Sequence, residues 1–320
     1  MNEVQLIDKF LKRLTKKKSS SQGLNDDIFF DKSNKLAVSV DTYVEKVHFP
    51  NFKAPDLVIK KILRSSLSDL ICKGVKPKYY FISASGNSKS FSNKNLKKIS
   101  NSLSLEQKKF DIELSGGDTV YSNTNSFTCC VIGFSNKIVK RHNSMIGDDI
   151  YITGHLGDSF IGLQILKKKI SIPKLLKKYF ISKFYMPSIN LKMVNFLQKF
   201  ANTSIDISDG LLIDLKKMIR QQKYGFSIKL DDIKLSNQLK KVLSSNKRYK
   251  VENTVFNGDD YEIIFTSHKK NRSLINKYAK NENLKIQRIG EILKKHQDSC
   301  ILKGNQKFKI NKNLGYTHQF

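Results

Sequence analysis

The stretch Ser204-Ile205-Asp206-Ile207-Ser208-Asp209-Gly210-Leu211 decides most about the fold of this chain. Its first half, Ser204–Ile207, is predicted to be a strand. A helix is predicted to begin at Ser208 or Asp209, because apolar residues then recur at helical spacing, as Leu211, Leu212, Leu215 and Ile219. Either polar residue can cap that helix, and a helix N-terminus also binds phosphate. The stretch therefore predicts a strand–turn–helix unit with carboxylates at the turn.

Five further acidic motifs occur in a chain that holds 58 lysines and arginines but only 28 acidic residues. They are Asn25-Asp26-Asp27, Ser39-Val40-Asp41-Thr42, Ser68-Asp69, Gly116-Gly117-Asp118-Thr119 and Gly258-Asp259-Asp260-Tyr261-Glu262. One such motif alone would indicate a solvated turn or a helix cap. Their recurrence predicts a shared site for a hard cation such as Mg²⁺, which takes oxygen ligands at about 2.1 Å and shares them with phosphates.

Two of these motifs make the prediction more specific. A strand through Leu36–Val40 is predicted to end at Asp41, with Ser39 on the same face, so that a hydroxyl and a carboxylate point to one side. A short strand before Gly116 is predicted to lead into two glycines, whose backbone can approach a phosphate closely. Asp118 then follows as a candidate ligand of the metal ion.

The order of the predicted elements indicates a mixed α/β protein. The predicted helices cover residues 4–14, 55–71, 94–109, 158–168, 173–182 and 188–200, besides the one after Ser208. The other predicted strands cover residues 79–85, 111–114, 126–134, 150–153, 226–230, 261–266 and 287–292, and the strand at 126–134 is expected to be central and apolar on both faces. The pattern resets near 137–147, which predicts an N-terminal domain over residues 1–140 and a C-terminal domain over 141–320.

Composition excludes several classes of protein. The net charge of +30 raises the possibility of nucleic-acid binding, but the lysines are spread along the chain and no basic run alternates with aromatics. A solvated basic surface is therefore the favoured interpretation, with no nucleic-acid partner. No apolar run reaches the ~20 residues of a membrane span, and the first residues lack a signal-peptide pattern, so we expect a cytoplasmic protein with no membrane partner. The four cysteines form no C-x-x-C pair and are expected to be reduced.

Taken in order, the motifs resemble those of the thiamine-monophosphate kinase family, within the superfamily of aminoimidazole ribonucleotide synthetase. The matching features are the acidic pair at Asp26, Ser39 to Thr42 with His48-Phe49, Leu67-Ser68-Asp69-Leu70, Gly116-Gly117-Asp118, Thr153 to Gly157, Ile205 to Leu211 and the Asp259 to Glu262 segment. The pattern departs from the family at Asn25, Ser66 and Asn257, and the arginines that usually flank Pro187 are absent.

The resemblance implies a two-domain fold, with an N-terminal mixed sheet that dimerises and a C-terminal α/β domain. It implies ATP-dependent phosphorylation of thiamine monophosphate to thiamine diphosphate by a homodimer with several Mg²⁺ ions. By resemblance, the metal ligands are Asp27, Ser39, Val40, Asp41, Asp69, Asp118, Asp206 and Asp209. The implied ATP contacts are Gly117, Asp118, Arg141 and Ser208, and the implied contacts of the thiamine phosphate are His48, Asp259 and Tyr316.

Direct in-line transfer assisted by metal ions is the expected mechanism, with no residue acting as a general base, because the acceptor phosphate is already charged. One alternative is another ATP-dependent synthetase of the same superfamily that acts on a different small substrate. A second alternative, from another class, is a basic nucleic-acid binder without activity. The intact aspartates argue against this second alternative.

Overall fold

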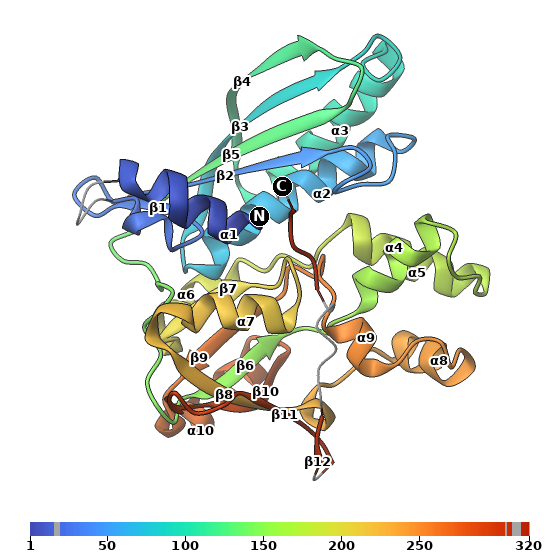
Figure 1. Cartoon of the computed structure of the whole chain (residues 1–320). Coiled ribbons are helices and arrows are strands. Elements are labelled where there is room, and N and C mark those ends of the chain that lie inside the picture. Colours follow the sequence, from blue (N-terminus) through green and yellow to red (C-terminus); the bar gives the residue numbers. More distant parts are fainter. Residues whose placement is uncertain (16–19, 305, 309–314, 320) are drawn as a thin grey trace.

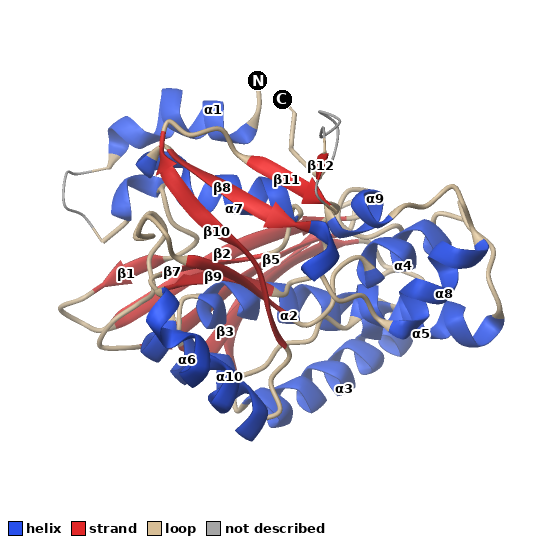
Figure 2. Cartoon of the chain, turned by 90° about the horizontal axis from the view of Figure 1, so that it is seen from below, coloured by secondary structure: helices blue, strands red, loops and turns tan. Residues whose placement is uncertain are grey.

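The computed structural model describes residues 1–15, 20–304, 306–308 and 315–319, which form two mixed sheets with helices outside them (Figure 1). Seen after a 90° turn, the strands occupy the middle of the molecule and α3, α6 and α10 lie along its outer side (Figure 2). The first and last described segments come together, since Asn2 and Gln319 form an antiparallel bridge. Within the described residues, no helix combines the length and apolarity that a membrane crossing requires.

The first sheet contains five strands in the order β1-β2-β5-β3-β4. Their bounds are β1 Phe29–Asp31, β2 Leu36–Val44, β3 Lys76–Gly86, β4 Glu113–Tyr121 and β5 Ser126–Phe134. All pairs are antiparallel except β3 with β4, which is parallel. Helices α2 (Pro55–Cys72) and α3 (Asn93–Phe110) pack together, and α2 covers β2 and β5.

The second sheet contains seven strands in the order β12-β11-β8-β10-β6-β9-β7. Their bounds are β6 Asp149–Thr153, β7 Thr203–Asp206, β8 Tyr224–Lys229, β9 Ile263–Ser267, β10 Ile286–Lys295, β11 Cys300–Lys303 and β12 Gln306–Lys307. The helices of this half are α4 Asp158–Leu166, α5 Lys174–Tyr185, α6 Lys192–Phe200, α7 Leu211–Ile219, α8 Asn237–Ser245, α9 Val251–Val255 and α10 Arg272–Asn281. The chain opens with α1 (Glu3–Leu6), which continues as a π turn over Ile7–Leu11 and a 3₁₀ turn over Lys12–Leu14. Other single 3₁₀ turns cover Gln22–Leu24, Arg220–Gln222, Leu230–Asp232 and Lys269–Asn271.

The predicted mixed α/β class is confirmed, and several local predictions are wrong. Strand β2 does not end at Asp41 but runs on to Val44, because Thr42 and Tyr43 are strong strand formers that pair with β5. The helix after the acidic turn begins at Leu211 rather than at Ser208. The Gly116-Gly117-Asp118 motif lies inside β4 and not in a turn after a strand.

One face of the first sheet is buried and the other is open. Strand β5 is central, as predicted, but its burial alternates: Phe127, Cys129 and Val131 are buried and face α2, while their neighbours are less covered. Every residue of the edge strand β4 is exposed. The predicted division at residue 140 stays a prediction, because one apolar cluster joins side chains of both sheets, among them Phe127 and Phe265.

Candidate functional site

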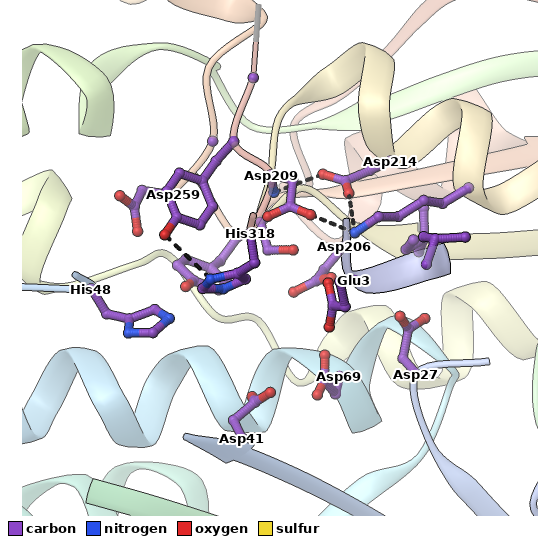
Figure 3. A pocket seen from close by; sticks show the side chains of 18 of the residues that line it. Glu3, Asp27, Asp41, His48, Asp69, Asp206, Asp209, Asp214, Asp259 and His318 are labelled. Atoms are coloured by element: carbon purple, nitrogen blue, oxygen red, sulfur yellow. Dashed lines mark hydrogen bonds and ion pairs between the residues drawn. The ribbon is translucent and has the colours of Figure 1, made fainter. Parts of the chain in front are cut away.

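A cavity of about 880 Å³ is lined by residues of both halves of the chain. Its walls come from the N-terminal helical segment, residues 24–27, β2, the end of α2, the turn after β7, the start of α7, residues 257–261 and the C-terminal residues 315–318. The close view shows carboxylates pointing into it from above and below, with Asp27 at one end and His48 at the other (Figure 3). Segments far apart in the sequence therefore share one acidic cavity.

Asp41, Asp69 and Asp206 form the middle of this cavity. They come from β2, from the last turn of α2 and from the end of β7. The Ser39 hydroxyl donates a short hydrogen bond to Asp69, and the Tyr43 hydroxyl donates to Asp41 Oδ2 at 3.0 Å. Ser39 is itself buried and does not line the cavity. It holds the Asp69 carboxylate in place from behind.

Crowding makes these three carboxyl groups reluctant to ionise together. Burial raises the pKa of Asp69 well above its ordinary value, and the nearby charges of Asp41 and Asp206 raise it further. Burial likewise raises the pKa of Asp41 and of Asp206. Loss of hydration on burial is the main cause for all three groups, and neighbouring carboxylates add to it. Such a cluster gains most from a bound cation.

The turn after β7 carries a second carboxylate pair. The backbone N–H groups of Asp209 and Gly210 both donate to Asp214 Oδ2 at 2.9 Å, so Asp214 holds the turn from the first part of α7. Asp214 is fully buried, and its Oδ1 accepts no hydrogen bond. Burial and the Asp209 charge raise the pKa of Asp214 to about 8. Lys217, one helical turn on, forms a short ion pair with Asp209 Oδ2 and lies 3.8 Å from that free oxygen.

Asp26 and Asp27 are held by two cations of the chain. Lys73 Nζ lies 2.8 Å from Asp26 Oδ1 and 2.7 Å from Asp27 Oδ2. The Arg141 backbone N–H donates to Asp26 Oδ2 at 2.9 Å, and its guanidinium contacts both oxygens of Asp27. These two carboxylates are therefore already neutralised, unlike those of the central cluster.

An aromatic corner occupies the opposite end of the cavity, next to Asp259. The His48 ring centroid lies 5.5 Å from that of His318, and the Tyr316 ring centroid lies 4.9 Å from that of His318. His48 Nδ1 accepts the Val44 N–H at 3.0 Å, and burial lowers the pKa of His48. The ring is therefore neutral near pH 7 and suits contact with a flat heterocycle.

Asp259 is positioned by a buried lysine and by its own loop. Lys61 Nζ donates to Asp259 Oδ1 at 2.6 Å, and its ammonium lies 4.0 Å from the Phe184 ring centroid. The Asp259 N–H donates to Ser208 O at 2.8 Å, which joins this loop to the turn after β7. Asp259 therefore keeps a fixed position relative to the metal-site candidates.

The structure brings together most, but not all, of the residues predicted from the sequence. The cavity is lined by Asp27, Val40, Asp41, His48, Asp69, Arg141, Asp206, Ser208, Asp209, Asp259 and Tyr316. Gly117 and Asp118 do not line it, since they lie on the exposed edge strand β4. A Cβ on Gly117 would lie 1.9 Å from Ile82 O, so this glycine is required where β4 approaches β3. The close approach of β4 to β3 therefore explains the glycine at position 117 without a bound phosphate.

Several residues of the site were missed from the sequence. They are Glu3, Lys61, Lys73, Asp214, Lys217 and His318. Asp214 had a usable signal, since it lies one helical turn after Gly210 and can reach back to the turn's N–H groups. The lysines carried no signal, because the sequence offers many lysines with no feature that marks these three.

The donor set of the cavity fits Mg²⁺. Among the residues that the structure describes, no three His, Cys, Asp or Glu side chains form a ready-made metal cage. Mg²⁺ does not need one, because it usually binds through one or two carboxylates and completes its shell with water and substrate phosphates. Asp214 Oδ1, buried without a hydrogen-bond partner, is a further oxygen at the same wall.

Comparison with known proteins places this fold in a defined class. The family described as "AIR synthase related protein, N-terminal domain" matches residues 25–135. The first sheet is therefore that of an AIR synthase-related N-terminal domain. A thiamine-monophosphate kinase of Buchnera aphidicola subsp. Schizaphis graminum is 36% identical, over 99% of this chain and 98% of that protein. This chain belongs to the thiamine-monophosphate kinase family.

Solved structures agree with this assignment. The structure of AaThiL complexed with AMPPCP and TMP superposes with a TM-score of 0.86 at 25% identity, covering 99% of this chain and 97% of that one. The thiamine monophosphate kinase from Aquifex aeolicus superposes with a TM-score of 0.81, also at 25% identity, covering 96% and 99%. The similarity extends over both sheets.

Proposed function

We propose that this protein transfers the γ-phosphoryl group of ATP to thiamine monophosphate, giving thiamine diphosphate. One observation carries the proposal: a single cavity joins a crowded carboxylate cluster to an aromatic corner. The cluster suits metal-bound phosphates, and the corner suits the flat rings of thiamine. The relatives named thiamine-monophosphate kinase and the AaThiL complex with AMPPCP and TMP support the same assignment.

We assign the residues of the central cluster to metal binding. Asp41, Asp69, Asp206 and Asp209 would hold Mg²⁺, with the Val40 backbone beside them and Ser39 fixing Asp69. Mg²⁺ bound there would neutralise the phosphates of both substrates. Ser208 would contact ATP at the turn before α7, which the hydrogen bonds to Asp214 hold in place.

The substrate end of the cavity is assigned from its rings and its carboxylate. Tyr316 and His48 would contact the rings of thiamine, and the cationic ring is favoured beside Asp259. The Tyr316 N–H donates to Asp209 O at 3.0 Å, so the aromatic corner and the metal-binding turn keep a fixed separation. This fixed geometry supports a direct in-line approach of the acceptor phosphate.

Positioning and charge neutralisation supply the catalysis in this proposal. The attacking oxygen belongs to a phosphate that is already ionised, so no side chain has to remove a proton from it. Arg141 would meet the ATP phosphates, although its guanidinium also holds Asp27. Preorganised cations of this kind stabilise charge that is spread over the transferring group.

Gly117 and Asp118 lie outside the cavity of their own chain and would act on ATP only in a homodimer. Strand β4 is a fully exposed edge, and Leu114, Val120 and Tyr121 on it are 45%, 52% and 77% exposed. A long exposed apolar edge invites pairing with a second copy. We propose that the N-terminal sheets of two chains pair through this region, and that the partner's Asp118 and the partner's Gly117 complete the nucleotide site. We place the enzyme in the cytoplasm, with residues 1–140 and 141–320 as its two domains.

A coupled assay of ADP release tests the activity. Thiamine monophosphate should support turnover in the presence of ATP and Mg²⁺, whereas thiamine and unrelated phosphorylated acceptors should not. Preference for a different acceptor would show instead that the protein is another ATP-dependent synthetase of the superfamily.

Subunit mixing tests the shared site. Asp118→Asn and Asp41→Asn chains should each be inactive alone. Mixed dimers should regain activity, because one of their two sites then has both aspartates. If mixing restores nothing while each variant dimerises normally, the role of Asp118 across the interface is wrong.

A further inference from the structure

Lys73 places a positive charge where no solvent reaches it. The residue follows the last turn of α2, and its side chain is 0% exposed. Its ammonium has three oxygen partners: Asp26 Oδ1 at 2.8 Å, Asp27 Oδ2 at 2.7 Å and the Ser204 carbonyl at 2.6 Å. An ammonium has three donors, so this group is fully satisfied and fixed in one position.

The oxygens of Asp27 are all engaged by cations of the chain. Oδ2 contacts Lys73 and accepts from Arg141 Nε at 3.1 Å, and Oδ1 pairs with the other side of the same guanidinium. Asp26 is engaged in the same way, by Lys73 and by the Arg141 backbone N–H. A divalent ion could bind Asp27 only by displacing a buried ion pair, and breaking such a pair leaves an uncompensated buried charge.

The central cluster lies beside this pair and is in a different state. Asp69 and Asp206 have no lysine or arginine in direct contact among the ion pairs of the described residues. The positive charge of Lys73 nevertheless favours the ionised form of both. The Lys73 ammonium therefore stabilises the charges of Asp26 and Asp27 by direct contact. It stabilises those of Asp69 and Asp206 by longer-range electrostatic attraction.

We propose that Lys73 is a built-in cation of this cavity, which takes the place of one divalent ion. Together with Arg141 it occupies Asp26 and Asp27, so Mg²⁺ binds through Asp41, Asp69, Asp206 and Asp209 and not through Asp27. The chain then binds one divalent ion fewer than it would with an uncharged residue at position 73. This inference rests on the proposed function, because it concerns the metal ions of that reaction.

Counting bound ions tests the inference directly. Mn²⁺ replaces Mg²⁺, and the signal of free Mn²⁺ is measured by electron paramagnetic resonance with AMPPCP present, for the full chain and for Lys73→Met. We expect Lys73→Met to bind one more Mn²⁺ per chain than the unaltered protein. Lys76→Met is the matched control, because Lys76 is 53% exposed and pairs with the surface residue Asp111, so its count should not change.

Asp27→Asn gives a second readout that does not depend on the folding of Lys73→Met. Because Asp27 is already occupied, its removal should leave the Mn²⁺ count unchanged. Equal counts for the unaltered protein and a folded Lys73→Met, or a lower count for Asp27→Asn, would overturn the inference. Equal counts with normal turnover of thiamine monophosphate would leave the proposed function intact, whereas an unaltered protein that binds no Mn²⁺ would remove both.

Discussion

Replacing Gly258 by alanine should disable the site without removing a single polar group from it. Gly258 precedes Asp259, and its Cα faces the turn after β7. A Cβ added there would lie 1.9 Å from Ser208 O and 2.8 Å from the Asp209 carbonyl carbon. Both neighbours are backbone atoms, so neither can swing aside as a side chain would.

The size of the effect follows from this overlap. Cβ atoms essentially never approach another heavy atom closer than 3.0 Å, so the two loops must separate by about 1 Å. The separation also strains the hydrogen bond from Asp259 N to Ser208 O, now 2.8 Å. Misplacement of reacting groups by about 1 Å costs about 100-fold in rate. We therefore expect kcat to fall about 100-fold for Gly258→Ala.

The assay is turnover of thiamine monophosphate, measured beside the melting temperature. Gly304→Ala is the matched control, because Gly304 has nothing within 4 Å of an added Cβ, although its φ of +59° makes alanine strained. The control should lose about 1 kcal/mol of stability and keep its kcat. A folded Gly258→Ala enzyme with near-normal kcat would refute the proposed coupling between the Asp209 turn and the Asp259 loop.

Three further outcomes are expected. Asp41→Asn should lower turnover by about 100-fold or more, yet raise the melting temperature in EDTA at pH 7. Burial raises the pKa of Asp41, so its ionised form destabilises the metal-free protein as the pH rises, and asparagine removes that cost; a lower melting temperature in EDTA would contradict this. Mg²⁺ should raise the melting temperature of the unaltered protein more than that of Asp41→Asn, and equal shifts would place the ion elsewhere. Asp149→Asn should destabilise the protein by about 2 kcal/mol at pH 7 in thermal or urea unfolding, because it weakens charge-assisted hydrogen bonds to Arg272 and Arg288. Although burial opposes ionisation, Arg272 and Arg288 hold the pKa of Asp149 below its ordinary value, so this contribution exists at neutral pH and is lost as the pH falls through that lowered pKa. A difference that persists unchanged at pH 3 would refute it.

Local pattern predicted the elements of this protein well. The helix at Pro55 has a proline at its first position and an apolar stripe, and both act within a few residues. The end of β2 was predicted wrongly, because pairing with β5 extends the strand beyond Asp41. Strand pairing involves residues more than 80 positions away, as between Thr42 and Thr128, and local pattern does not contain it.

The double glycine shows the same limit at the level of the site. The sequence Gly116-Gly117-Asp118 is typical of a phosphate-binding turn. Parallel pairing of β4 with β3 instead places Gly117 opposite Ile82 within a strand. In the proposed dimer, the role of Asp118 depends on a second chain and not on its neighbours in sequence. The order of the motifs indicated the family. The three-dimensional structure determines which of the motif residues line the cavity.

The sequence by itself determined the alternation of helices and strands and the positions of the acidic turns, since these depend on side chains within one or two turns of each other. Only the tertiary structure decided which carboxylates lie close together and which lysines and arginines form ion pairs with them. Lys73 contacts a carbonyl 131 residues away, and nothing in its neighbourhood along the chain separates it from the many lysines at the surface. A charge acts through space, so its role is set by the oxygens that folding brings around it.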